Sequence, residues 1–126
     1  MNDLNGVGAL DGPGDLEGLD GLVDQWLSYQ EVGDLIGVSA NKVRQMCRDL
    51  ELIAVSGRIP ADFLVDGRVV KGLAGTLTVL ADSGYDPEAS VRWLYRPDDS
   101  LPGAPIDALR EHRLREVRRR AQALAF

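Results

Sequence analysis

Two short helical patterns lie back to back in the stretch YQEVGDLIGVSANKVRQMCRDL, residues 29–50. The tetrapeptide SYQE at 28–31 has the S-x-x-E spacing of a capping box, which satisfies the free amide groups at a helix start. Gly37 ends the first pattern, and Ser39 suits the N-cap of a second helix over residues 40–50. Apolar residues recur at helical spacing in both segments, at Val32, Leu35 and Ile36 in the first and at Val43, Met46, Cys47 and Leu50 in the second.

The spacing of this pair predicts a helix-turn-helix. Such a motif needs a small residue where the helices cross, a glycine at the turn and apolar residues that lock the helices together. Gly33 is the expected crossing residue, and Gly37 is the expected turn. The expected locking positions are Val32, Ile36, Val38, Val43 and Met46.

The second helix carries its polar side chains opposite its apolar stripe. At about 100° per residue, Asn41, Arg44, Gln45 and Arg48 fall on the face away from Val43, and Lys42 lies on a flank. Residues 38–48 contain three bases and no acid. Arg, Asn and Gln suit bidentate contacts with guanine and adenine edges, so we expect residues 40–50 to be a recognition helix for the major groove of duplex DNA. An ordinary solvated helix face is the alternative.

A small hairpin is predicted after the second helix, because two β-prone runs of LIAVSGRIP flank Ser56-Gly57. A winged helix-turn-helix has its wing here, and Arg58 could contact phosphate or the minor groove. Arg68 and Lys71 could extend this basic edge, although ordinary surface charge explains each of the three equally well. Phosphate contacts would make the affinity salt-dependent. The candidate DNA-binding residues are Ser39, Asn41, Lys42, Arg44, Gln45, Arg48, Arg58, Arg68 and Lys71.

The net charge of −6 over 126 residues is unevenly distributed. Residues 1–24 hold six of the twenty acidic residues and no base, so residues 25–126 hold fourteen of each sign. A domain that is neutral predicts modest DNA affinity for a monomer, which a homodimer would raise. The tail has six glycines in its first 21 residues and is expected to be disordered. Its carboxylates could compete with DNA phosphates for the arginines, or the tail could be an inert solubilising segment.

The expected organisation has three parts: a disordered acidic Gly-rich tail at 1–24, a winged helix-turn-helix domain at 25–71 and a small C-terminal helical domain at 72–126. The fold class is therefore mainly α with a short β-hairpin. Asp86-Pro87-Glu88 is a typical helix start, and a final helix is expected from Pro105 nearly to Phe126. Its arginines 118–120 suit a helix C-terminus, with a second phosphate-contacting patch or a dimer surface as alternatives.

The segments RVVKGLAGTLTVL, RWLYRPDDSL and RRAQALAF, together with the helix-turn-helix, carry a family resemblance. Residues 27–126 resemble the small actinobacterial, chiefly mycobacterial, winged helix-turn-helix proteins known as serine/threonine-kinase substrates. The helix-turn-helix part also resembles MerR and excisionase domains, in which GVS and RIP recur. The resemblance implies a DNA-binding regulator whose DNA affinity falls when a kinase phosphorylates a threonine in the N-terminal tail. Residues 1–27 contain no Thr, Ser or Tyr, so that site cannot be inherited here.

The segment RWLYRPDDSLPGAPIDAL permits a second interpretation. It is similar to the W-L-x-x-P-x-x-x-L-x-G-x-x-P-x-x-x-L spacing of toxin-binding domains in Xre/ParS-type antitoxins. This implies a protein-interaction module as the alternative function. The same residue types also make a helix-loop-helix corner, so a shared structural turn explains the match as well. The matching residues are Trp93, Leu94, Pro97, Leu101, Gly103, Pro105 and Leu109.

Catalysis, metal binding and a membrane span find no support in the sequence. The lone Cys47 cannot form an internal disulfide, and one Cys with one His, His112, cannot assemble a zinc site. Cys47 is expected to pack in the core rather than act as a reactive thiol. No Walker loop or nucleophile elbow is present, and no apolar run approaches about 20 residues. We therefore expect a cytoplasmic non-enzyme with no cofactor.

Overall fold

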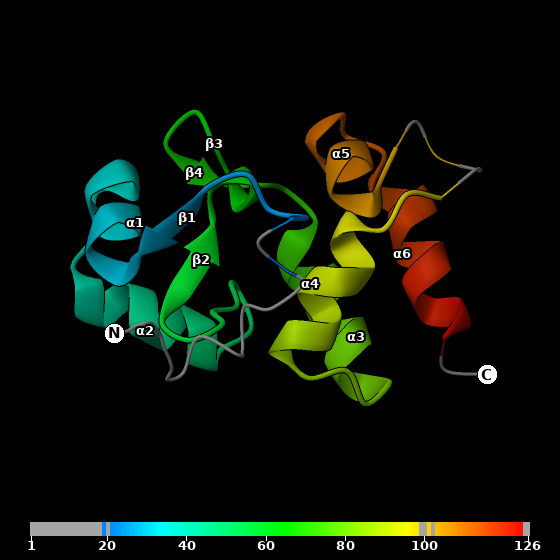
Figure 1. Cartoon of the computed structure of the whole chain (residues 1–126), viewed down its shortest axis with the longest axis horizontal. Helices are drawn as coiled ribbons and strands as arrows, with labels where there is room; N and C mark the ends of the chain where they lie inside the picture. The colour runs from blue at the N-terminus through cyan, green and yellow to red at the C-terminus, as the bar shows by residue number, and fades with distance from the viewer. Residues whose placement is uncertain (1–18, 20, 99–100, 102, 125–126) are drawn as a thin grey trace.

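The computed structural model describes residues 19, 21–98, 101 and 103–124. The elements in chain order are β1 (Trp26–Ser28), α1 (Tyr29–Ile36), α2 (Ala40–Arg48), β2 (Arg58–Pro60), the 3-10 helix η2 (Ala61–Phe63), β3 (Leu64–Val65), β4 (Arg68–Val69), α3 (Leu73–Asp82), α4 (Pro87–Tyr95), α5 (Pro105–Arg110) and α6 (Leu114–Ala123). Two groups lie side by side along the longest axis of the molecule: α1, α2 and the strands at one end, and α3 to α6 at the other (Figure 1).

Both helices of the first pair begin where the sequence predicts. The Ser28 hydroxyl accepts a hydrogen bond from the Glu31 amide at 3.1 Å, and the Glu31 carboxylate accepts one from the Ser28 amide at 2.8 Å. This is the reciprocal pairing of a capping box. The Ser39 hydroxyl caps α2 by accepting from the Lys42 amide at 3.0 Å. Gly37 ends α1 with a φ of 82°, a conformation that favours glycine.

Gly33 is the residue that lets α2 approach α1. A Cβ built on Gly33 would lie 2.5 Å from the carbonyl oxygen of Val38, in the backbone that leads into α2. The carbonyl of Gly33 itself accepts hydrogen bonds from the amides of Gly37 and Val38 at 2.8 and 2.9 Å. The predicted helix-turn-helix is therefore confirmed, with Gly33 at the crossing.

Two details of this pair differ from expectation. Leu35 was assigned to the buried stripe of α1 but is 56% exposed. The buried residues of α1 are Val32 and Gly33. At about 100° per residue, these two and half-buried Ile36 define one face of the helix, and Leu35 lies outside that face. The recognition helix is also shorter than 40–50, because α2 ends at Arg48 and Leu50 has a φ of 60°.

The strands form two small sheets. β1 pairs antiparallel with β2, with Leu27 opposite Ile59, and β3 pairs antiparallel with β4. The predicted hairpin at Ser56-Gly57 is present only as a turn: both residues have positive φ, 52° and 74°, as a type I′ turn requires. The run before the turn forms no strand and contributes one isolated bridge, Val55 to Arg58, whereas the run after it is β2, which pairs with β1. The amides and carbonyls of Val55 and Arg58 close this turn with hydrogen bonds of 2.8 and 3.0 Å.

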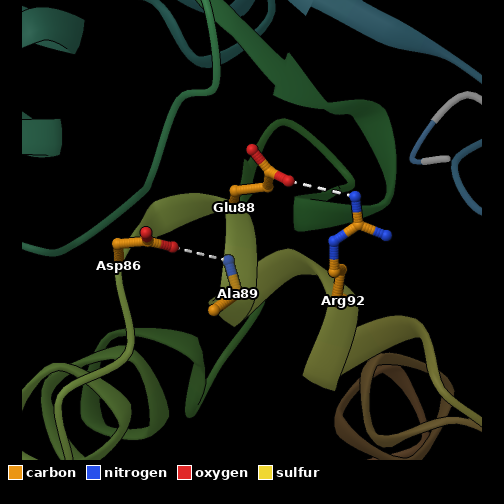
Figure 2. Close-up of polar contacts among 4 residues, drawn as sticks. All are labelled: Asp86, Glu88, Ala89 and Arg92. Atoms are coloured by element: carbon orange, nitrogen blue, oxygen red, sulfur yellow. Dashed lines mark hydrogen bonds and ion pairs between the residues drawn. The ribbon is translucent and has the colours of Figure 1, made fainter. Parts of the chain in front are cut away.

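In the helical group, α4 begins with a side-chain N-cap, Asp86. The Asp86 carboxylate accepts a hydrogen bond from the Ala89 amide at 2.8 Å, and Glu88 pairs with Arg92 at 3.0 Å on the same helix (Figure 2). Pro87 occupies the first turn, where its missing amide costs nothing. The predicted helix start at Asp86-Pro87-Glu88 is therefore confirmed.

The predicted continuous helix from Pro105 is wrong, because the chain breaks between α5 and α6. His112 has a φ of 66°, and the amides of His112 and Arg113 donate back to carbonyls of Leu109 and Ala108 at 3.0 and 2.9 Å. This left-handed residue closes α5 in the way that glycine commonly does. α6 therefore starts anew at Leu114 in a direction of its own.

Three hydrogen bonds join the two groups. The Arg110 guanidinium of α5 donates to the carbonyl oxygens of Asp62 and Leu64 at 2.8 and 2.7 Å. The Tyr95 hydroxyl of α4 donates to the Asp62 carboxylate at 2.9 Å. Burial, and then the Asp62 carboxylate, raise the pKa of Tyr95 far above its usual range, so the hydroxyl remains a donor. These contacts join α4 and α5 to η2 and to the first residue of β3.

The antitoxin-like spacing lies on the corner between α4 and α5. Leu94, Leu101 and Leu109 are buried, and the amide of Asp98 donates to the carbonyl of Gly103 at 3.0 Å. Packing of this corner accounts for the apolar residues of the motif.

One buried cluster runs through both groups, and it includes Leu19 and Val23, which the sequence places in the tail. Leu19 is fully buried, and its carbonyl accepts hydrogen bonds from the amides of Leu22 and Val23 at 2.9 Å. Cys47 packs against the cluster as a half-buried residue. Burial raises the pKa of the Cys47 thiol to about 11, against the opposing charge of Arg48.

Replacing Gly33 by Ala should lower the free energy of unfolding by about 1–3 kcal/mol, because the added methyl group must displace the backbone at Val38. Gly21→Ala is the matched control, since nothing lies within 4 Å of its Cβ position. Urea unfolding followed by circular dichroism measures both. Equal stability of the two variants would contradict the close crossing.

Iodoacetamide should alkylate Cys47 slowly in the folded protein. The thiolate is the reactive species, and a pKa of about 11 in place of 9.0 lowers its population roughly a hundredfold below pH 9. Mass spectrometry at pH 8 should show this slowing relative to the same protein in urea. Equal rates in the two states would show that the thiol is not shielded.

Candidate nucleic-acid interface

The outward face of α2 presents the predicted polar residues to solvent. Ser39 is the N-cap of the helix, and the side chains that follow point away from the buried Val43 and Met46. The candidate residues on this helix that are exposed are Ser39, Asn41, Lys42, Arg44 and Arg48, with Gln45 half-buried. Neither Arg44 nor Arg48 is covered by another element, so both are accessible to a ligand.

Arg44 is held over an aromatic ring. Its guanidinium carbon lies 4.8 Å from the centroid of the Tyr29 ring, and one of its nitrogens donates to the Asn41 side-chain oxygen at 2.8 Å. A guanidinium stacked on an aromatic face gains about 0.5–1 kcal/mol at an exposed site. Tyr29 is the first residue of α1, so the crossing of the two helices determines this contact.

Arg48 forms a second polar group along the same helix. It donates to the Gln45 side-chain oxygen at 2.8 Å, and the Gln45 amide nitrogen donates to the Asp49 carboxylate at 3.0 Å. The side chains that point from the helix are thus linked at i, i+3 and i+4 spacing. They are ordered but remain on the surface.

The positive charge of this face is not neutralised. Among the described residues, the hydrogen-bond acceptors of Arg44 and Arg48 are neutral amide oxygens, and no ion pair within 4.0 Å involves these arginines or Lys42. The net contribution of one such exposed hydrogen bond to stability is only about 1 kcal/mol. These hydrogen bonds can therefore be exchanged for contacts with an anionic ligand.

Arg58 lies beside this face. It follows the Ser56-Gly57 turn and pairs with Ser28 across the β1–β2 ladder. A Cβ on Gly57 would lie 3.8 Å from the Tyr29 ring, so the turn adjoins the residue that supports Arg44. The turn is thus in the position of a wing next to the recognition helix.

Arg68 and Lys71 lie elsewhere. Arg68 opens β4, and the turn of that hairpin lies near the end of α1, where a Cβ on Gly67 would be 3.4 Å from the Leu35 carbonyl oxygen. The β3–β4 hairpin and α2 lie at opposite edges of the molecule in Figure 1. Lys71 follows β4 next to the start of α3. Both side chains are exposed, but the fold does not bring them to the α2 face.

Tyr29 is the residue of this surface that sequence reasoning does not identify. The S-x-x-E signature marks it only as the first helical position, and its contact with Arg44 depends on a non-local crossing. The predicted acidic tail, and its competition for the arginines, fall on residues 1–24, most of which lie outside the described residues.

Neither a metal-ligating group nor a membrane-spanning helix occurs in the described part of the chain. It contains no group of three His, Cys, Asp or Glu side chains that could hold a metal ion. None of its helices is long and apolar enough to cross a membrane.

Comparisons with known proteins agree with this geometry. Residues 19–64 match the family model described as the wHTH domain of DNA-binding protein Rv2175c, and residues 70–125 match the Rv2175c C-terminal domain of unknown function. The DNA-binding protein Rv2175c of Mycobacterium tuberculosis is 42% identical over 112 residues, covering 75% of this chain and 77% of the relative. The NMR structure of Rv2175c superposes with a TM-score of 0.73 at 40% identity, covering 81% of this chain and 82% of that one. The chain belongs to the Rv2175c family of winged helix-turn-helix proteins.

Proposed function

We propose that this protein binds double-stranded DNA through α2 and the Ser56-Gly57 turn and acts as a transcriptional regulator. The observation that supports the proposal is the exposed Arg/Asn/Gln face of α2, whose guanidinium groups are ordered by neutral partners. The relative that carries the same two domains is named a DNA-binding protein. A DNA partner places the protein in the cytoplasm, and the function needs no catalytic step.

In the proposed complex α2 lies in the major groove. Asn41, Arg44, Gln45 and Arg48 face the base edges, because they share the side of the helix opposite Val43. Lys42 and the Ser39 cap, at the start of the helix, approach the phosphate backbone. Arg58 on the wing contacts phosphate or the adjacent minor groove. Arg68 and Lys71 lie away from this face and make at most peripheral phosphate contacts.

A homodimer on DNA is part of the proposal because the overall charge of the domain is weak. Residues 25–126 carry no net charge, so one copy of α2 gives modest affinity. A homodimer would place two copies of α2 on a DNA site and raise it. Light scattering of the protein–DNA complex gives the stoichiometry that tests this arrangement. Control by a kinase through a tail threonine is not part of the proposal, because residues 1–27 contain no hydroxyl side chain.

The alternative is a protein-interaction module, and a mobility shift with random duplex DNA separates the two. Binding at low salt that weakens steeply as salt rises supports a DNA-binding protein. Absence of binding at low salt would favour the interaction module. Sequencing of genomic DNA captured by the protein, followed by expression analysis of the adjacent genes, tests the regulatory role.

Arg44→Ala with Arg48→Ala should weaken binding to a 30-base-pair duplex at least about tenfold, because a lost bidentate contact to a base costs roughly 1–3 kcal/mol. The matched control is Arg68→Ala with Lys71→Ala, which removes the same charge from residues away from α2. Fluorescence anisotropy should show a smaller effect for the control. Equal losses in both double variants would contradict α2 as the contact surface.

Tyr29→Leu should weaken DNA binding about two- to fivefold, because Arg44 loses the aromatic face that orders it. Tyr29→Phe keeps the ring and should bind like the natural protein. Anisotropy titrations at one fixed salt concentration make the comparison. If Tyr29→Phe fell as far as Tyr29→Leu, the hydroxyl rather than the ring would be responsible.

A further inference from the structure

We propose that the outer face of α6 is a second nucleic-acid contact that binds consecutive phosphate groups of a DNA strand. The α6 arginine face is defined by Arg115, Arg118 and Arg119. The inference assigns a role to the C-terminal helical part and rests on the proposed function only in taking DNA as the partner.

Packing leaves this face of α6 open. Val117 and Ala121 are fully buried, and half-buried Leu114 lies against Gly72 before α3. At about 100° per residue, Arg115 and Arg119 point to the side opposite these apolar residues. Arg118 lies on a flank, where its guanidinium rests over Gly75 of α3, a position at which any Cβ would collide with it. All three arginines are exposed.

The arginines of this region fall into two classes. Arg113 pairs with Glu116 at 3.3 Å, and Arg120 approaches Asp98 at 4.0 Å. Arg115, Arg118 and Arg119 form no hydrogen bond or ion pair with the residues that the structure describes. Residues 113–120 hold five arginines and one acid, so no carboxylate of the described residues neutralises the α6 arginine face.

Helix stability does not account for this arrangement. The macrodipole favours cations in the last turn, where Arg120 lies. Arg115 is in the first turn of α6, where the same dipole disfavours a positive charge. A basic residue at this position therefore points to an external anion rather than to the helix itself.

The spacing fits a phosphate backbone. Arg115, Arg118, Arg119 and Gln122 stand at i, i+3, i+4 and i+7 and, with Leu114, line an open hollow of about 390 Å³. Seven residues of helix rise about 10 Å. Successive phosphates of a DNA strand are separated by about 3.4 Å along the axis and also by their turn around it, so the row with its long arginine side chains reaches about two to three phosphates. The planar guanidinium fork suits such oxygens.

A membrane surface fits less well. Amphipathic helices that lie on bilayers place large apolar side chains next to their basic residues. The large exposed hydrophobic residues in the described part of the chain are Leu22 and Leu35, and neither belongs to α6. The α6 arginine face is purely polar, which favours a polyanion in water.

The two basic surfaces have fixed positions. α2 and α6 lie at opposite ends of the longest axis (Figure 1), and the Arg110 and Tyr95 contacts join the two groups. DNA that contacts both surfaces must either extend along the molecule or come from two separate segments.

The test replaces Arg115, Arg118 and Arg119 by Gln and measures binding to a 30-base-pair random duplex by anisotropy between about 50 and 300 mM KCl. Each lost phosphate contact lowers the slope of log affinity against log salt by about 0.9, so the triple variant should lose about 2–3 of that slope. Its affinity at low salt should fall at least about fivefold. Thermal unfolding by circular dichroism verifies that the variant remains folded.

The matched control replaces Arg92, Arg113 and Arg120 by Gln, which removes the same charge from arginines that already pair with carboxylates. It should change the slope by less than about 1. Equal slopes for the triple variant and the control would overturn the inference, because net charge alone would then explain the effect.

Three further arms complete the test. If Arg44→Ala with Arg48→Ala weakens binding while the α6 variant matches its control, the inference fails and the proposed function stands; the reverse result leaves α6 as the contact and removes α2. Duplexes of about 12 and 30 base pairs show whether α2 and α6 contact the same DNA molecule. A single duplex that contacts both helices must be the longer one, whereas two short duplexes can each contact one helix. If the triple variant lost binding to phosphatidylglycerol vesicles but kept its binding to DNA, the α6 arginine face would be a membrane contact and the inference would be overturned.

Discussion

The close approach of α1 and α2 at Gly33 is the constraint on which the rest of the N-terminal group depends. A carbonyl oxygen occupies the place that any larger side chain would need, so the angle between the helices is determined by backbone contact rather than by adjustable side chains. That angle brings the Tyr29 ring under Arg44. It also directs Val43 and Met46 inward and leaves the polar residues of α2 exposed. The arrangement of the side chains that we propose to contact DNA thus depends on the absence of a side chain at Gly33.

The features that the sequence predicts well are those with a local physical cause. Ser28, Ser39 and Asp86 cap helices because a short side chain can reach an amide three residues later. Gly37 and Gly57 mark turns because their φ values are positive. The caps and turns, together with the apolar stripes, are enough to predict a winged helix-turn-helix from the sequence. The candidate residues of α2 lie on the face of the helix that their spacing predicts.

The features that the sequence does not predict depend on distant parts of the chain or on rare conformations. Leu35 is exposed because α2 crosses on the Gly33 side of α1, which periodicity within α1 does not specify. The sequence does not predict β1, since its pairing with β2 joins residues thirty or more positions apart. The break at His112 needs a left-handed conformation that a histidine adopts only occasionally. Arg68 and Lys71 follow the wing in sequence, yet the β3–β4 hairpin lies away from it.

The neutral partners of Arg44 and Arg48 have a consequence for how the molecule meets its ligand. A guanidinium paired with a carboxylate exerts little force at a distance, whereas one paired with an amide keeps its full charge. The chain as a whole is negative, and its excess negative charge is confined to residues 1–24. In the potential around a polyanion, the charged guanidinium groups of α2 draw this face toward the ligand before contact. Productive encounters then become more frequent without any increase in the strength of the final complex, and added salt reduces this orienting effect first.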